Sequence, residues 1–256
     1  MLLCFDVGNT HTTLGLYDGE RLVRQWRVRT TERTTDELGL TLLQLLGHAG
    51  VAPATIAAVA VCSVVPSFQF TLDKACRRYL DRAPKVVDPR SSTVGMPIRI
   101  DNPAELGADR VINALAARRR LPAPFLIVDF GTATTFDCVD ASGAYVGGAI
   151  APGLQIAADA LFSRTSRLPR TEIARPVSPV GTSTVTAIQS GVYWGYVGLV
   201  DGLARRCKEA LGGGAPVPCI ATGGLSNLIG RACAEIDEVD PDLTLTGLRI
   251  WSEEQL

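Results

Sequence analysis

The chain has 256 residues, which suits one large domain or two domains of ordinary size, and 46% of them are hydrophobic. Its 25 Lys and Arg residues nearly balance 26 Asp and Glu residues, so the formal net charge is −1. Such a balance predicts neither nucleic acid nor an anionic membrane as a partner. The longest apolar run, 56–65, is too short to span a bilayer, and no secretory leader is expected.

The cysteines and histidines narrow the chemistry further. The seven cysteines are odd in number, several lie inside apolar runs, and none forms a CxxC pair. This usage predicts buried, reduced thiols in a cytoplasmic protein and argues against a structural zinc site. With only His11 and His48 available, the sequence also argues against Ser-His-Asp catalysis.

The first predicted element is a buried strand over 2–5 that ends in a polar tip. Asp6 and Gly8 follow that apolar run directly, and residues 12–17 are expected to return as the second strand of a hairpin. Hydroxyl groups and backbone N–H groups are therefore expected to gather in the tight loop between the two strands.

Helices and strands then alternate along the chain. Thr34 and Glu37 form a capping-box signature, which predicts a helix over 36–46 that ends at Gly47 or Gly50. The elements expected after it are a strand over 56–63, a helix over 68–80, a strand over 85–87 and one helix from the cap at Asn102 to about Arg120.

The opening pattern recurs at residue 125. An apolar run over 125–128 is followed by Asp129, Gly131 and several Thr residues, and Asp129 follows Asp6 by nearly half the chain length. Two copies of a buried strand with an Asp at its tip and a Gly two residues later predict two related halves.

Three further segments fit more than one interpretation. Residues 164–184 are rich in Pro, Ser and Thr and predict a long loop that is either functional or flexible. A strand over 217–221 leads into Thr222-Gly223-Gly224 and a helix, which fits a ribose or adenine contact or a simple helix cap. Gly191 and Gly195, on a predicted helix, indicate a close helix–helix contact, within the chain or across a dimer interface.

The paired strand tips favour a phosphate site. A turn that offers backbone N–H groups and Thr hydroxyls suits phosphate oxygens, and the Asp beside it can position a cation. Two such turns facing each other across a cleft could hold the β- and γ-phosphates of a nucleotide. Phosphoryl transfer depends chiefly on positioning and charge neutralisation, which these groups supply. One Asp-x-Gly is an ordinary turn; two copies in the same setting favour phosphate.

Asp109 and Arg110 are a second candidate pair. They lie among apolar residues of the predicted 102–120 helix, so they are either a solvated surface pair or groups held at the wall of a binding site. In the second case Asp109 could accept a proton from a substrate hydroxyl that attacks phosphorus. Arg110 could bind a substrate carboxylate through paired hydrogen bonds.

Together these motifs resemble the type III pantothenate kinase family. The segments that carry the resemblance, in the family's order and spacing, are Asp6-Val7-Gly8-Asn9-Thr10, Ser63-Val64-Val65-Pro66, Gly107-Ala108-Asp109-Arg110, Asp129-Phe130-Gly131-Thr132-Ala133-Thr134, residues 147–153, Thr222-Gly223-Gly224 and residues 240–248. The resemblance implies an α/β fold of two duplicated actin/hexokinase-like (ribonuclease H-like) domains, at 1–118 and 119–256, with a cleft between them. It implies ATP-dependent phosphorylation of pantothenate to 4′-phosphopantothenate, the first step of coenzyme A biosynthesis.

The resemblance also implies roles for individual residues. Asp109 matches the general base, Asp129 matches a ligand of the required monovalent cation (K⁺ or NH₄⁺), and Thr132 matches an ATP contact. The residues that match the substrate-binding positions are Gly107, Ala108, Asp109, Arg110 and Thr184. The residues that match the ATP phosphate loop are Asp6, Val7, Gly8, Asn9, Thr10, His11, Thr12 and Thr13, with Asp6 near Mg²⁺.

Two further expectations follow from the resemblance. The family forms homodimers in which the partner subunit contributes to the site, so a homodimer is expected here. Ile100 stands where many members carry a Tyr three residues before the Pro of the substrate-side segment. A hydrogen bond to pantothenate is therefore expected to be missing or to be supplied elsewhere.

Two alternative functions stand beside this interpretation. A non-catalytic regulatory relative of the same fold would not need to keep Asp6, Asp109, Asp129 and Thr132 together, and the lack of a basic surface argues against direct DNA contact. A kinase or phosphohydrolase of the same superfamily could act on a sugar or acetate instead. Arg110, within the substrate-side segment, favours a substrate that carries a carboxylate.

Overall fold

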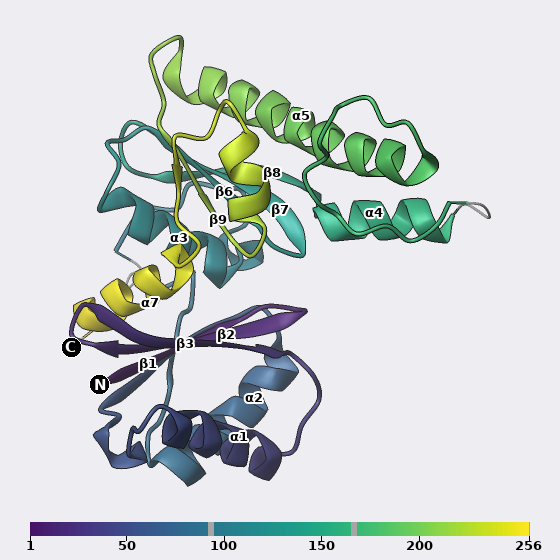
Figure 1. Cartoon of the computed structure of the whole chain (residues 1–256). Coiled ribbons are helices and arrows are strands. Elements are labelled where there is room, and N and C mark those ends of the chain that lie inside the picture. Colours follow the sequence, from purple (N-terminus) through teal and green to yellow (C-terminus); the bar gives the residue numbers. More distant parts are fainter. Residues whose placement is uncertain (92–94, 165–167, 256) are drawn as a thin grey trace. The chain divides into compact units, whose positions relative to one another are not determined.

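The computed structural model describes residues 1–91, 95–164 and 168–255, and the chain divides into two compact units (Figure 1). Unit 1 comprises Met1–Gly95, Asn102–Ala116 and Thr244–Leu256, and unit 2 comprises Met96–Asp101 and Ala117–Leu243. The division after residue 116 lies beside the boundary expected after 118. Residues 244–256, at the C-terminal end of the expected range 119–256, have their contacts within unit 1.

Unit 1 is built on a mixed five-stranded sheet. Its strands are β1 (Leu2–Val7), β2 (His11–Asp18), β3 (Arg21–Arg29), β4 (Ala58–Ser63) and β5 (Lys85–Val86), in the order β3-β2-β1-β4-β5. The first three strands form an antiparallel meander, and β4 and β5 run parallel to β1. The edge strand β3 was not predicted, because its side chains are largely charged and only partly buried.

The helices of unit 1 follow the predicted capping signals in part. Helix α1 (Thr35–His48) begins after Thr34, whose side chain and that of Glu37 form the predicted capping box. Helix α2 (Pro66–Ala75) continues as a π-helical turn over Cys76–Leu80, which confirms a helical segment to residue 80.

The single helix expected from Asn102 to Arg120 is wrong. Asn102 caps only a 3-10 turn over Pro103–Glu105, by accepting a hydrogen bond from the backbone N of Ala104 at 3.2 Å. Leu106 is extended, so the chain leaves the helical conformation there, and α3 (Ala108–Arg118) begins afresh. This break places Asp109 in the first turn of a helix rather than in its middle.

Both faces of the unit 1 sheet are covered. Leu3, Phe5 and Val7 pack on one face with residues of α1 and α2, and Figure 1 shows these two helices on one side of the sheet. Cys4 packs on the other face with α3 and with α7 (Leu243–Glu254). Because successive side chains of a strand point to opposite faces, Asp6 shares the face of Cys4.

Unit 2 repeats this topology. Its strands are β6 (Phe125–Phe130), β7 (Ala133–Val139), β8 (Tyr145–Pro152), β9 (Cys219–Thr222) and β10 (Glu238–Val239), in the order β10-β9-β6-β7-β8. Here β6, β7 and β8 form the antiparallel meander, β9 runs parallel to β6, and β10 runs parallel to β9. The match of strand order and direction confirms the two related halves.

The helices of unit 2 lie mainly between β8 and β9. Helix α4 (Leu154–Ser163) runs alongside α5 (Thr184–Gly212) in Figure 1, and α5 packs on the sheet through Tyr193, Tyr196 and Val200. Residues 168–183 contain no helix or strand, in agreement with the expected loop, whereas 165–167 lie outside the described ranges. The helix expected after Thr222-Gly223-Gly224 is the four-residue α6 (Ser226–Ile229).

Within the described ranges, no helix combines the length and the apolar composition that crossing a membrane requires.

Candidate active site

The first strand tip is the β1–β2 hairpin of unit 1. Asp6 is the penultimate residue of β1, and residues 8–10 connect it to β2. The loop closes on itself, because the backbone N of Gly8 donates to the carbonyl of His11 at 3.1 Å. Asn9 and Thr10 are exposed. The loop thus presents polar groups at its turn, as a phosphate-binding segment requires.

Two members of the predicted phosphate loop are buried instead. Val7 belongs to the core, and Thr12 is only 1% exposed. The Thr12 hydroxyl hydrogen-bonds to that of Thr30 at 2.9 Å. Side-chain contact with a nucleotide is therefore limited to other members of the 6–13 segment.

Thr30, which was not predicted from the sequence, holds the loop backbone in place through hydrogen bonds. It follows β3, and its hydroxyl donates to the carbonyl of Gly8 at 2.7 Å. Its backbone N donates to the carbonyl of Thr10 at 3.1 Å. With the Thr12 bond, one residue fixes three positions of the loop. No sequence motif marked Thr30, because the nearest signal, the capping box at Thr34, predicts only the start of a helix.

His11 is a neutral member of the loop. Its Nδ1 lies 3.2 Å from a guanidinium nitrogen of Arg27, from which it accepts a hydrogen bond in the neutral state. Burial lowers the pKa of His11, and the charges of Arg27 and Arg29 lower it further. At neutral pH the imidazole therefore brings no positive charge to a phosphate.

A hollow of about 400 Å³ adjoins this loop within unit 1. Its lining residues are Asn9, Thr30, Thr31, Glu32, Arg33, Val65, Ser67, Phe68 and Thr71. The guanidinium of Arg33 is held by the hydroxyl of Thr41 at 3.1 Å. The hydroxyls, the guanidinium of Arg33 and the carboxylate of Glu32 make the lining polar, so the hollow extends the polar surface of the loop.

The second strand tip, at β6, has a tighter turn. Asp129 is again penultimate in its strand, and only Gly131 and Thr132, both exposed, connect β6 to β7. Thr134 occupies the position that Thr12 holds in unit 1 and is equally buried. Its hydroxyl is bonded to the phenol of Tyr196, which donates to the carbonyl of Pro152 at 3.1 Å.

The end of β9 lies against this tip. Asp129 pairs with Thr222 in the parallel ladder. Gly223 follows with φ +91°, and a Cβ placed there would overlap Asp129 Oδ1 and lie 2.7 Å from the carbonyl oxygen of Phe130. Only glycine leaves room for the Asp129 carboxyl in this position. A carboxylate and a hydroxyl residue therefore meet at one strand end.

The carboxylates fit the expected ions only together with other oxygen donors. No group of three or more His, Cys, Asp or Glu side chains placed to hold a metal ion occurs in the part of the chain that the structure describes. Mg²⁺ commonly takes one or two carboxylates and fills its shell with substrate phosphates and water, so a single Asp6 fits that pattern. Asp129 beside Thr222 offers the hard oxygen donors that a monovalent cation prefers.

Asp109 lies in the first turn of α3 and is half-buried. Burial raises the pKa of its carboxyl, although the backbone N–H and the charge of Arg110 counteract part of that rise. The Arg110 N–H donates to Asp109 Oδ1 at 2.9 Å. A Cβ on Gly107 would overlap the same oxygen, so Gly107 keeps space beside the carboxyl. A half-buried carboxylate with a raised pKa is a stronger base than a surface Asp.

Thr184 and Ile100 both belong to unit 2. Thr184 is the first residue of α5, next to the cap Ser183, and it is exposed. The segment that carries Ile100 bridges to β8, since Ile98 pairs with Tyr145. A Cβ on Gly147 would lie 3.8 Å from a methyl carbon of Ile100. Ile100 thus packs beside β8 with an apolar side chain that cannot make the hydrogen bond of the expected Tyr.

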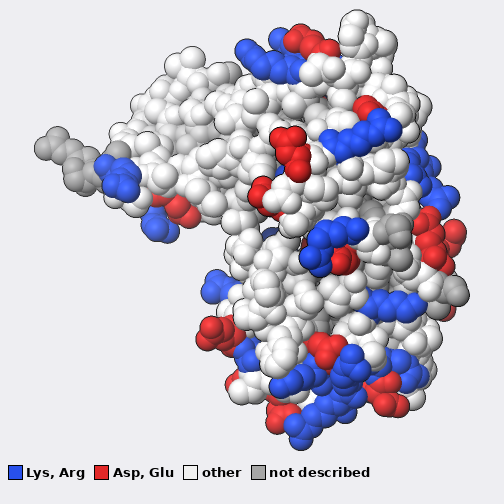
Figure 2. Space-filling view, turned by 180° about the vertical axis from the view of Figure 1, so that it is seen from behind, with Lys and Arg blue, Asp and Glu red and all other residues white. Residues whose placement is uncertain are grey.

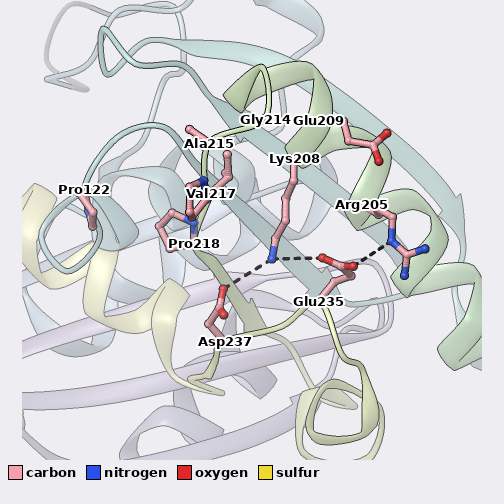
Figure 3. A pocket seen from close by; sticks show the side chains of 11 residues that line it. Pro122, Arg205, Lys208, Glu209, Gly214, Ala215, Val217, Pro218, Glu235 and Asp237 are labelled. Atoms are coloured by element: carbon pink, nitrogen blue, oxygen red, sulfur yellow. Dashed lines mark hydrogen bonds and ion pairs between the residues drawn. The ribbon is translucent and has the colours of Figure 1, made fainter.

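A larger hollow, of about 610 Å³, lies at the opposite end of β9 (Figure 3). Figure 3 shows Lys208 reaching between Glu235 and Asp237, to which its Nζ lies at 3.4 Å and 3.6 Å. Arg205 pairs with the same Glu235 at 3.0 Å. The charged groups of these ion pairs neutralise one another. The lining residues Pro122 and Pro218 lie before the first residues of β6 and β9, whereas the strand tips lie after the last residues of these strands. The hollow is therefore no part of the strand-tip sites.

Solved structures place this duplicated α/β arrangement in a known class. A protein from Campylobacter jejuni assigned to the Baf family of transcriptional activators has a TM-score of 0.60 at 17% identity, over 99% of this chain and 98% of that one. The polyphosphate/ATP-glucomannokinase of Arthrobacter sp. strain KM has a TM-score of 0.53 at 16% identity, over 100% and 99%. The fold is the actin/hexokinase-like fold of sugar kinases and ATPases.

Sequence similarity narrows the class to one family. The sequence profile of type III pantothenate kinases matches residues 2–206. A type III pantothenate kinase from Anaeromyxobacter sp. (strain K) is 53% identical over 254 residues, which are 99% of each chain. The chain belongs to the type III pantothenate kinase family.

Proposed function

We propose that this chain transfers the γ-phosphoryl group of ATP to the primary hydroxyl of pantothenate and so begins coenzyme A biosynthesis. The observation that carries the proposal is the 53% identity to a type III pantothenate kinase over 99% of both chains. The chain also keeps both strand-tip carboxylates and Asp109. We place the reaction in the cytoplasm, where ATP and reduced thiols occur together.

The first strand tip would bind the phosphates of ATP. Asn9 and Thr10 are exposed in the loop, and Thr30 holds the loop backbone through the carbonyls of Gly8 and Thr10. Asp6 would hold Mg²⁺. When bound, Mg²⁺ neutralises charge on the phosphate oxygens, which lowers the barrier to nucleophilic attack on phosphorus.

Asp109 would act as the general base. Its carboxylate would accept the proton of the pantothenate hydroxyl as that oxygen attacks the γ-phosphorus, and the bond to the β,γ-bridging oxygen breaks. Arg110 would bind the pantothenate carboxylate through paired hydrogen bonds. Thr184, exposed at the start of α5, would contribute a further contact to pantothenate. In unit 2, Thr132 would contact ATP and Asp129 would bind K⁺ or NH₄⁺.

The homodimer expected for this family would form through α4, α5 and the loop between them. Figure 2 shows the surface over these elements as mostly uncharged. The exposed apolar residues of this region are Ile150, Ile156, Leu161, Val177, Val180 and Val185. On α5, a Cβ added to Gly191, Gly195 or Gly198 would meet no atom of another described element within 4 Å, so these three positions face open space. Small exposed residues at helical spacing favour close approach of a second helix.

An oligomer measurement tests this surface. Replacing Gly195 by Arg should convert the dimer to a monomer in light scattering, because the new side chain blocks close helix approach. Gly195→Ala should remain folded and gain helix propensity, so it controls for effects on the helix itself. Light scattering that shows the Arg variant as a dimer would place the interface elsewhere.

The decisive experiment for the reaction is a coupled assay of ATP turnover with and without pantothenate, in Mg²⁺ and K⁺. Asp109→Asn should lower kcat by on the order of 10²–10⁴-fold. Because burial raises the pKa of Asp109, the wild-type kcat should fall as pH is lowered from neutral through that pKa. The Asn variant should lack this acidic limb.

The same assay separates the alternative functions. Turnover of glucose or acetate in place of pantothenate would favour the other superfamily kinases. No ATP turnover would favour the regulatory relative.

Protein stability separates this effect from misfolding. A carboxyl with a raised folded-state pKa favours folding below its unfolded pKa, and that contribution is lost as pH rises through the folded pKa. Asp109→Asn removes a half-buried charge, so at pH 8 it should unfold at the same temperature as the wild type or higher. A variant that loses activity and also unfolds earlier would remove Asp109 from the proposed mechanism.

A further inference from the structure

The second strand tip holds a buried polar group that the proposed function does not use. Thr222, the last residue of β9, has no exposed surface, and its Oγ1 has no hydrogen-bond partner in the part of the chain that the structure describes. An unsatisfied buried polar group costs about 1–3 kcal/mol. The position of this hydroxyl in the same ladder as Asp129 makes it a candidate ligand atom.

The strand register places this hydroxyl residue beside Asp129. The two residues are neighbours in the parallel ladder of β6 and β9. The preceding pair, Val128 and Ala221, packs in the core under α5, so alternation puts Asp129 and Thr222 together on the opposite face. Gly223 leaves its own backbone bare against the Asp129 carboxyl. Because Gly223 has no side chain, the Asp129 carboxyl can lie against the backbone that directly follows Thr222.

The equivalent position in unit 1 differs in chemistry. There the parallel neighbour of Asp6 is Cys62, on β4, which is also fully buried. A thiol is a soft donor, whereas a hydroxyl is a hard donor of the kind that alkali cations prefer. The duplicated fold therefore offers a hard oxygen beside Asp129 and none at the matching position beside Asp6.

We propose that Thr222 Oγ1 is, with Asp129, a ligand of the monovalent cation. This inference rests on the proposed function, in which Asp129 binds K⁺ or NH₄⁺. A ribose or adenine contact is the other ligand role that fits Thr222-Gly223-Gly224. A hydroxyl without exposed surface is out of reach of a ribose, whereas a single desolvated ion can be enclosed by buried oxygen donors.

The test is thermal unfolding of Thr222→Val in KCl and in NaCl at equal ionic strength. In NaCl the variant should unfold at the wild-type temperature or higher, because the hydroxyl it loses has no partner. In KCl the wild type should gain stability by cation binding, and the variant should need at least about tenfold more K⁺ for half of that gain. Thr222→Ser, which restores the hydroxyl, should recover the wild-type K⁺ dependence.

Thr244→Val is a matched control. Thr244 is also buried, but its hydroxyl donates to Asn113 Oδ1 at 2.8 Å. The variant should unfold earlier in both salts and keep the wild-type K⁺ dependence. If Thr222→Val does not fold, the pair Thr222→Ala and Thr222→Ser gives the same comparison.

The outcomes separate the inference from the proposed function. Equal K⁺ dependence in wild type and Thr222→Val, with the loss confined to Asp129→Asn, overturns the role of Thr222 alone. A wild type that gains no stability from K⁺ overturns the cation site as a whole, while the pantothenate assay still decides the reaction. A Thr222→Val variant that keeps its response to K⁺ but loses stabilisation by ATP and Mg²⁺ assigns Thr222 to the nucleotide instead.

Discussion

The two strand tips share a topology and differ in what surrounds the carboxylate. At the first tip, residues 8–10 form an open loop whose backbone is held by the hydroxyl and N–H of Thr30. At the second, the turn is shorter, Asp129 lies against Gly223, and the hydroxyl of Thr222 has no partner in the described ranges. After duplication, the backbone and the Asp were kept while the neighbours changed. Under the proposed function, the first tip would bind phosphate and the second a small cation.

The largest effect expected from this comparison is on turnover. Asp6→Asn should lower kcat by on the order of 10²-fold, because a group that organises charge on the phosphates is lost, and added K⁺ should not restore it. Asp129→Asn should show a loss that shrinks as the K⁺ concentration rises, since a weakened site still fills at high salt. Initial rates across a K⁺ titration distinguish the two. If the two variants responded identically to K⁺, the proposal that Asp6 serves the phosphates and Asp129 the cation would be wrong.

The two strand tips should also differ in how strictly they require glycine: substitution should destabilise the protein more at Gly223 than at Gly8. Gly223→Ala should cost about 3 kcal/mol of unfolding free energy, because the methyl group meets backbone and carboxyl atoms at a positive φ. Gly8→Ala should cost less than about 1 kcal/mol, since its Cβ would lie 3.1 Å from only one atom, the His11 carbonyl oxygen. Urea unfolding curves give both values. Equal costs would show that the tips are equally crowded.

Loss of the hydrogen bonds by which Thr30 holds the first loop should cause a moderate rise in KM for ATP. Thr30→Val removes the donor to the Gly8 carbonyl and should raise KM for ATP about 5- to 10-fold, with a smaller change in KM for pantothenate. Thr30→Ser should restore the ATP value. Thr55→Val, which loses a 2.7 Å bond to the Ala52 carbonyl elsewhere in unit 1, serves as the control. A matching rise in both KM values would mean that Thr30 only stabilises the fold.

The smallest effect is expected at the far end of β9. Lys208→Met loses two ion pairs with Glu235 and Asp237, so unfolding should become easier by at most about 1 kcal/mol. The kinetic constants should stay at wild-type values, because this hollow lies at the start of the strands. A fall in kcat or a rise in KM for ATP would connect the hollow to the reaction and break the separation drawn here.

The two strand tips could be predicted from the sequence, because each is marked by a motif that spans only a few consecutive residues. The capping box of Thr34 and the repeated Asp-x-Gly are of this kind. Strand β3 was not predicted because four of its nine residues are Arg and its apolar side chains are only partly buried. Thr30 escaped because its bond to Gly8 spans 22 residues and exists only once the meander sets its register. Thr222 could be recognised as unpartnered only from its surroundings in the fold.

The placement of α7 bears on how the chain acquires its structure during synthesis. Leu245, Leu248 and Trp251 complete the same core as Cys4 and Ile112. The ribosome makes these residues only after the whole of unit 2 has been translated. The part of this sheet face that α7 covers must therefore wait exposed, with only α3 in place, and the half that is translated first finishes folding last. A nascent chain stalled before residue 243 should expose that face to chaperones, although most of its own sequence is already present.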